Sequence, residues 1–250
     1  MKKKHIDLPD NQAFILGDNT PFAIKEAYSI ARSNLRSTLM GVPGCKIVAV
    51  VGANPGDGKS TTCINMAITT AKAGAKVLVI DGDMRRSTMH KYLNLPNEIG
   101  LSNVLCGYTN LDEAIHNTDV GIACMTAGEP PINPAELLMS DLMRELLELL
   151  SKHYDYIFID SPPVPLTSDA LSLADMVSGY IITVRNEITP VDQLDKCIEA
   201  LKFANGKLLG IMVNNADSGQ GSYRYKKYSY KYKKGYYYNN YYDYQAKKEQ

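Results

Sequence analysis

The stretch VVGANPGDGKSTT, residues 50–62, decides the fold of this 250-residue chain. An apolar run leads into a loop that contains Gly56, Gly58 and Lys59, and a helical pattern follows. Glycines let backbone N–H groups turn inward around an anion, and the first turn of the next helix adds free amides and its dipole. The stretch matches G-x-x-x-x-G-K-[ST], except that Ala53 replaces the first glycine. We therefore predict a phosphate-binding loop between a strand and a helix.

This loop predicts a nucleotide site with defined roles for its residues. Lys59 is expected to reach the β- and γ-phosphates, and the Ser60 hydroxyl to bind Mg²⁺. The residues predicted to contact the nucleotide here are Pro55, Gly56, Asp57, Gly58, Lys59, Ser60 and Thr61.

Two further apolar runs end in carboxylates. VLVIDGDMRR, residues 77–86, delivers Asp81, Asp83 and Arg85 directly after a strand, and YDYIFIDSPPV, residues 154–164, delivers Asp160. In open α/β sheets, ligands bind at the carboxyl ends of the strands. We predict catalytic roles for Lys59, Asp81, Asp83 and Arg85, and Mg²⁺ ligation by Ser60, Asp81 and Asp160. Arg85 could either offset charge near the phosphates or hold a neighbouring subunit. Asp160 stands where a Walker B carboxylate would lie.

The rest of the pattern predicts an α/β fold with a parallel sheet flanked by helices. Apolar, unalternating runs indicate buried strands; they cover 46–51, 76–80, 154–159, 180–184 and 208–213, with a sixth near 120–126. Helical patterns cover 22–40, 60–73, 134–151 and 190–205. We predict three parts: an N-terminal segment with an oligomerisation helix (1–45), a P-loop domain (46–216) and a flexible tyrosine-rich tail (217–250).

Charge separates the tail from the rest. Residues 221–250 hold eight Lys or Arg and two Asp or Glu, which leaves 19 basic and 25 acidic residues elsewhere. The tail therefore carries +6 and the remainder −6, although the whole chain sums to zero. Five scattered cysteines without CxxC spacing indicate reduced thiols rather than disulfides, and the four histidines are too far apart to predict a zinc site. No apolar run approaches the ~18 residues of a membrane span.

Taken together, these motifs resemble the bacterial tyrosine kinases of capsule and exopolysaccharide synthesis. The resemblance extends to GLSNVLCG (100–107), AGEPPINPAELLMS (127–140) and DSPPVPLTSDA (160–170). It implies an ATP- and Mg²⁺-dependent protein-tyrosine kinase, in which residues 77–86 form the family's extra Walker A′ motif. It also implies that the tail is the autophosphorylation cluster, presented to a neighbouring subunit. The implied phosphoacceptors are Tyr223, Tyr225, Tyr228, Tyr230, Tyr232, Tyr236, Tyr237, Tyr238, Tyr241, Tyr242 and Tyr244.

The resemblance also implies partners. The family forms rings through E-x-x-R-x-x-R; here Glu26, Ser29 and Arg32 occupy its fixed positions, so the middle arginine is absent. Glu26 and Arg32 are the expected oligomer contacts. A separate membrane-bound activator and a cognate tyrosine phosphatase are implied, with the chain in the cytoplasm at the inner face of the membrane.

The sequence leaves several roles open. A tyrosine hydroxyl arrives protonated, so a carboxylate must accept its proton; Asp81 is the first choice and Asp83 the second, but base and metal ligand are not separated. Asn214 and Asn215 close the last strand, where amides suit adenine recognition or a simple turn.

Two other classes of protein compete with the kinase. A positioning ATPase of the partition or septum-site type would carry K-G-G-x-G-K, but Asn54 and Pro55 stand where its early lysine and first glycine belong. A tail of aromatics and lysines also resembles single-strand nucleic-acid binders. The acidic remainder of the chain disfavours that reading, so nucleic acid is not an expected partner.

Overall fold

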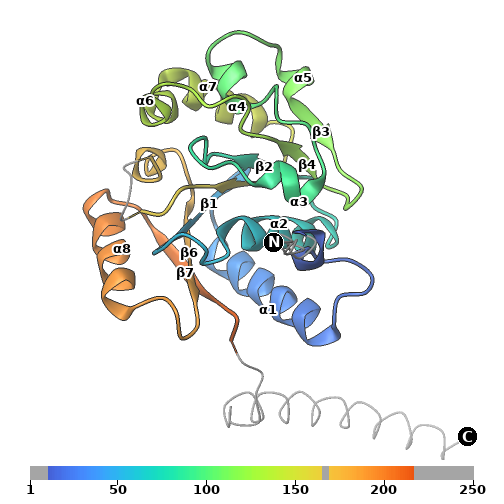
Figure 1. Cartoon of the computed structure of the whole chain (residues 1–250), viewed down its shortest axis with the longest axis vertical. Helices are drawn as coiled ribbons and strands as arrows, with labels where there is room; N and C mark the ends of the chain where they lie inside the picture. The colour runs from blue at the N-terminus through green and yellow to red at the C-terminus, as the bar shows by residue number, and fades with distance from the viewer. Residues whose placement is uncertain (1–10, 165–168, 217–250) are drawn as a thin grey trace, which may run out of the picture. The chain divides into compact units, whose positions relative to one another are not determined.

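The computed structural model describes residues 11–164 and 169–216. A seven-stranded sheet has the order β3-β4-β2-β5-β1-β6-β7, and its strands run parallel except for the β3–β4 pair (Figure 1). The strands are β1 (Lys46–Gly52), β2 (Val77–Asp81), β3 (Ile115–Asn117), β4 (Ala123–Met125), β5 (Tyr156–Asp160), β6 (Gly179–Arg185) and β7 (Leu208–Asn214). The predicted α/β sheet flanked by helices is confirmed.

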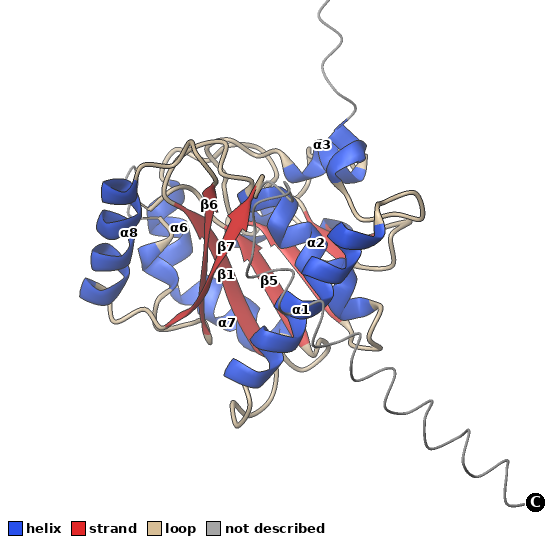
Figure 2. Ribbon diagram, turned by 90° about the horizontal axis from the view of Figure 1, so that it is seen from below, coloured by secondary structure: helices blue, strands red, loops and turns tan. Residues whose placement is uncertain are grey.

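Helices cover both faces of this sheet. They are α1 (Phe22–Thr38), α2 (Lys59–Ala71), α3 (Met89–Leu93), α4 (Leu101–Leu105), α5 (Leu111–Ala114), α6 (Pro134–Met139), α7 (Asp141–Leu150) and α8 (Val191–Phe203), with 3₁₀ turns η1 (Asn11–Phe14) and η2 (Leu171–Leu173). In Figure 2, α1 and α2 lie on one side of the strands and α6 and α8 on the other. The described helices include none that is long and apolar enough to cross a membrane.

Alternate strand residues supply the two faces of the core. Val48 and Val50 of β1 pack with α1 and α2, whereas Ala49 and Val51 pack with α8. On β5, Phe158 points to the α2 side, while Ile157 and Ile159 join α6 and α7. Both faces of the central strands are buried, so their sequences read as continuous apolar runs.

Two differences from the sequence-based prediction have local causes. The helix predicted over 134–151 is broken at Ser140, whose backbone is extended (ψ 154°) and whose hydroxyl accepts a hydrogen bond from the Met143 N–H at 3.2 Å. Ser140 is therefore the N-cap of α7, a position at which serine is favoured because its hydroxyl can accept a hydrogen bond from a free backbone N–H. The second difference is β3, a three-residue antiparallel edge strand that the prediction lacks.

The predicted tail and its eleven phosphoacceptor tyrosines lie outside the described residues. The compact unit that contains the sheet ends at Asn214.

Candidate active site

The phosphate loop connects the end of β1 to the start of α2. Gly56 and Gly58 have φ angles of 84° and 85°, which L side chains rarely adopt. Asn54 N–H donates to Asp57 Oδ2 at 2.7 Å, and the Thr189 hydroxyl donates to Asp57 Oδ1 at 2.6 Å. The buried Asp57 carboxylate thus ties the loop to itself and to the segment after β6.

The last strand supports the same loop from the other side. The Asn214 amide donates to the Asp57 carbonyl at 2.7 Å and to Thr62 Oγ1 at 3.0 Å. A Cβ added to Gly58 would lie 2.5 Å from Asn214 Nδ2, so this glycine allows the close approach. Asn214 is therefore a loop-supporting residue here, and its reading of adenine stays a prediction. Asn215 is exposed with a φ of 54°.

Lys59 is folded back over the end of β1. The residue is only 8% exposed, and a Cβ on Gly52 would lie 2.9 Å from Lys59 Cγ. Gly52 thus makes room for the lysine, a role that no motif in the sequence indicates. Thr61 donates its hydroxyl to the Gly58 carbonyl at 2.9 Å, and Pro55 is exposed.

Asp81 and Asp160 lie side by side on β2 and β5, where they are register partners. Both are buried, at 0% and 1% exposure. Burial and the repulsion between them raise the pKa of Asp160 to about 8; Lys59 and a Ser60 hydrogen bond oppose this shift. Burial raises the pKa of Asp81 to about 6. Asp160 Oδ1 is buried without a hydrogen-bond partner.

Asp81 also organises the segment after β2. Its Oδ1 accepts from Asp83 N–H at 3.2 Å, and its Oδ2 accepts from the Ser87 hydroxyl at 2.9 Å and from Met89 N–H at 3.2 Å. Both oxygens are therefore engaged. Asp83 is 8% exposed and accepts from Arg86 N–H at 3.0 Å.

Arg85 forms a bidentate ion pair with Asp169. Arg85 Nε donates to Asp169 Oδ2 at 2.7 Å, and Arg85 Nη2 donates to Asp169 Oδ1 at 3.2 Å. The Arg85 side chain is 46% exposed and that of Asp169 is 1% exposed. Asp169 was not predicted as a site residue, although it belongs to the DSPPVPLTSDA segment.

A divalent cation fits the residues present. Buried carboxylates and a hydroxyl, from Asp81, Asp160 and Ser60, supply the hard oxygen ligands that Mg²⁺ prefers, and the orphaned Asp160 Oδ1 offers one without rearrangement. In the described ranges no three His, Cys, Asp or Glu side chains form a metal cage. Mg²⁺ commonly takes one or two carboxylates and completes its shell with phosphates and water.

Glu26 and Arg32 lie apart from this site, on α1. Glu26 is exposed, whereas Arg32 is half-buried, and its Nε is buried without a hydrogen-bond partner. Their expected contact with a neighbouring subunit stays a prediction.

A phosphate loop and two neighbouring carboxylates at the carboxyl edge of a mostly parallel sheet define a P-loop nucleotide-binding domain. The AAA domain family model matches residues 45–209. The chain is 35% identical over 190 residues to the tyrosine-protein kinase YwqD of Bacillus subtilis, covering 76% of this chain and 80% of that protein. It is 34% identical over 212 residues to the putative tyrosine-protein kinase CapB of Staphylococcus aureus, covering 84% and 92%.

Solved structures agree with these relatives. The kinase domain of the Escherichia coli tyrosine kinase ETK matches with a TM-score of 0.74 and 32% identity, over 80% of this chain and 79% of that one. The septum-site-determining protein MinD of Pyrococcus horikoshii, complexed with Mg-ADP, matches with a TM-score of 0.59 and 25% identity, over 70% and 72%. The chain belongs to the family of bacterial tyrosine-protein kinases.

Proposed function

We propose that this chain is an ATP- and Mg²⁺-dependent kinase that phosphorylates the tyrosine cluster of a neighbouring copy and regulates capsular or extracellular polysaccharide synthesis. One observation supports the chemistry above all others. Lys59, Ser60, Asp81 and Asp160 converge at one edge of the sheet, and a buried carboxylate oxygen there has no partner.

The nucleotide would be held by the loop amides and by Lys59, whose charge balances the transferring phosphoryl group. Ser60, Asp81 and Asp160 would hold Mg²⁺, which neutralises phosphate charge when bound. Arg85 is proposed to act near the phosphates, with Asp169 fixing its guanidinium. Because Asp57 and Asn214 fix the loop before ligand arrives, its donors need little reorganisation.

The tyrosine oxygen would attack the γ-phosphorus, the bond from that phosphorus to the bridging oxygen of ADP would break, and the phenolic proton would pass to a carboxylate. The sequence favours Asp81 as this acceptor. Both of its oxygens already accept hydrogen bonds, and it is fully buried. We therefore propose Asp83, which is slightly exposed, as the proton acceptor, and assign Asp81 to metal ligation.

The position of the last strand supports a tail-directed reaction. β7 runs parallel to β1, and its final residue, Asn214, contacts the phosphate loop. Residue 215 therefore continues the chain from the edge that holds the nucleotide site. We propose that 46–216 is the catalytic domain, that 217–250 is the substrate segment, and that Glu26 and Arg32 contact the next copy in a ring.

The proposed partners follow from the family. A separate membrane-bound activator would bring the chain to the inner face of the membrane, and a tyrosine phosphatase would reverse the modification. The second candidate function, a positioning ATPase, is favoured by the likeness to MinD. Against it stand Asn54 and Pro55 in the loop, and a lower identity than to the kinases.

Intact-mass measurement after incubation with Mg-ATP and an activator's cytoplasmic segment tests this function, with Lys59→Met as the control. We expect a ladder of phosphate-sized steps in the wild type alone, which is lost when the eleven tail tyrosines are replaced by phenylalanine. Steady ATP turnover without any ladder would instead establish the switch ATPase.

A further inference from the structure

The end of the sheet opposite the phosphate loop collects basic side chains. β1, β2, β4, β5, β6 and β7 run in one direction, so all of them begin at this end. The helices that precede β1 and β7 end there. The described segments 36–46, 72–76, 151–155 and 202–207 turn at this end, and we call their exposed surface the strand-start face.

The strand-start face is strongly cationic. Its seven basic residues are Arg36, Lys46, Lys72, Lys76, Lys152, Lys202 and Lys207, and Asp155 is its acidic residue. The turns before β4 and β6 lie at the same end of the sheet and add Asp119 and Asp175, of which Asp175 pairs with Arg144 at 2.6 Å. Because residues 1–220 carry a net charge of −6, this concentration of positive charge runs against the rest of the chain.

Helix dipoles explain only part of the pattern. Arg36 and Lys202 lie in the last turns of α1 and α8, where a cation is favourable. The starts of strands hold three more lysines, Lys46, Lys76 and Lys207, and a helix dipole does not explain their charge.

Two adjoining cavities lie among these side chains. One, of about 540 Å³, is lined by Lys46, Lys76, Lys152 and Asp155; the other, of about 260 Å³, is lined by Arg36, Lys46 and Tyr156. Lys46 belongs to both. Asp155 Oδ2 accepts a hydrogen bond from the backbone N–H of Lys76 at 2.8 Å, so one oxygen of this carboxylate already has a backbone partner.

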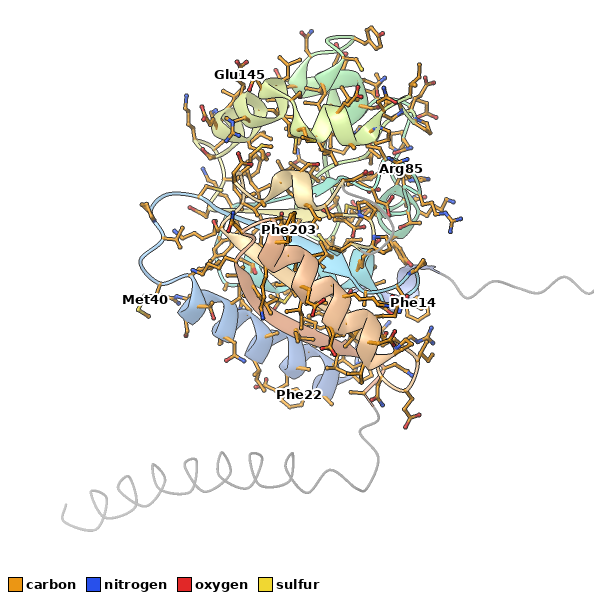
Figure 3. All side chains as sticks on the ribbon, turned by 90° about the vertical axis from the view of Figure 1, so that its left-hand side faces the viewer. Phe14, Phe22, Met40, Arg85, Glu145 and Phe203 are labelled. Carbon is orange, nitrogen blue, oxygen red and sulfur yellow. The ribbon has the colours of Figure 1, made fainter. Side chains whose placement is uncertain are left out.

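Two of the segments that form this face, 36–46 and 202–207, also carry exposed large apolar side chains. Met40 follows α1 and is 80% exposed; Phe203 closes α8 and is 90% exposed. Figure 3 shows Met40 at the opposite side of the molecule from Arg85 and Phe14. A cationic surface with protruding apolar groups is typical of proteins that lie on membranes, where the two contributions add.

We propose that the strand-start face docks directly on anionic phospholipid headgroups, with Met40 and Phe203 entering the interface. The opposite edge, with the phosphate loop and the end of β7, then faces away from the bilayer and stays open to nucleotide and to a neighbouring copy. This contact is separate from any activator protein and from kinase activity.

Co-sedimentation of the full chain with vesicles, without ATP or activator, tests the proposal. We expect binding to vesicles of phosphatidylcholine with phosphatidylglycerol, weak binding to phosphatidylcholine alone, and release at high salt. Each lysine near such a surface adds about fivefold to binding, so the Lys76→Gln/Lys152→Gln variant should bind about 25-fold more weakly. The Met40→Ser/Phe203→Ser variant should also bind more weakly to the anionic vesicles.

The matched control is Lys25→Gln/Lys91→Gln, which removes the same charge from exposed or half-exposed sites far from this face. It should bind within about twofold of the wild type, since its charges lie more than a Debye length from the surface. Equal losses in both double variants would overturn the proposal in favour of diffuse attraction, including that of the tail. Displacement by glycerol phosphate at constant ionic strength would overturn it in favour of a soluble phosphate site. Thermal melting of each variant checks that it is folded.

Discussion

At the scale of single residues, the site depends on two carboxylates that disfavour each other's charge. Asp81 and Asp160 are register partners on adjacent strands, both are buried, and one oxygen of Asp160 has no hydrogen-bond partner. Two buried carboxylates side by side destabilise the folded chain, but they favour binding of a divalent cation. Such a pair is expected at a functional site rather than in a purely structural core.

This pair predicts a pH dependence of stability. The pKa of Asp160 is about 8 in the folded chain, against 3.8 for an ordinary aspartate, so the folded state holds the proton more tightly than the unfolded state. Stability therefore falls as pH rises between these values. In Mg²⁺-free buffer, we expect the melting temperature of the wild type to fall from about pH 5 to about pH 8, and that of Asp160→Asn to fall less.

Mg²⁺ supplies the control for this experiment. It should raise the melting temperature of the wild type more at the higher pH, where a proton no longer competes, and should have little effect on Asp160→Asn. Parallel melting curves for the two proteins across this range would contradict the assigned pKa shift.

The Arg85–Asp169 pair predicts that substituting Arg85 and substituting Asp169 will destabilise the folded chain by different amounts. Arg85→Ala leaves the buried Asp169 carboxylate without its bidentate partner, whereas Asp169→Asn leaves a half-exposed guanidinium that water can solvate. We expect urea unfolding to show a loss of about 2–3 kcal/mol for Arg85→Ala and about 1 kcal/mol for Asp169→Asn. The reverse order would contradict the desolvation argument and would show that the Asp169 carboxylate stabilises the fold through contacts other than its pair with Arg85.

At the scale of elements, the phosphate loop is held by segments far away in the sequence. Thr189, from the segment after β6, and Asn214, from the end of β7, bond to its side chain and backbone. The loop therefore takes its shape from the completed sheet as well as from its own glycines.

Substituting Gly56 and Gly58, whose φ angles are nearly equal, distinguishes the effect of the glycine conformation from the effect of the contact with β7. Gly56→Ala and Gly58→Ala both place a Cβ at a positive φ, which costs about 1–2 kcal/mol. Only the Cβ at Gly58 meets Asn214, at 2.5 Å, whereas the space around Gly56 is open. We expect Gly58→Ala to lose about 1 kcal/mol more than Gly56→Ala in urea unfolding, from the lost amide bonds, and to bind nucleotide more weakly. Equal losses would show that φ strain alone limits the loop.

The elements also show how far the sequence could predict the structure. Long buried strands and the helices after residues 58 and 190 were predictable because their apolar runs are long and bounded by glycine or proline. β3 was not, because three residues carry too little pattern. The break at Ser140 depends on one side-chain cap, and the roles of Gly52, Asn214 and Asp169 arise from contacts that only the folded chain brings together.

At the scale of the whole molecule, charge divides the chain into unlike parts. Residues 221–250 carry +6 and the rest −6. From these charges we expect the unmodified tail to be attracted to acidic surface on its own or another copy. Each phosphate adds about −1.5 to −2, so three or four phosphates would cancel the tail's charge.

This balance predicts that phosphorylation loosens an assembly. Light scattering on matched phosphorylated and unphosphorylated samples should show a smaller mean mass after modification, with the difference shrinking as salt screens the charges. A chain with all tail tyrosines replaced by phenylalanine, treated with ATP in the same way, should keep its mass. Equal masses for the phosphorylated and unphosphorylated wild type at low and moderate salt would contradict the electrostatic explanation.

The bond between Asn214 and the phosphate loop also bears on synthesis of the chain. The loop sequence leaves the ribosome early, but its partner in β7 lies 157 residues after Asp57. A nascent chain that has not yet added its last strand therefore lacks the amide that fixes the loop. Nucleotide capture should begin only when translation of the sheet is complete, so prematurely terminated products would not compete for ATP.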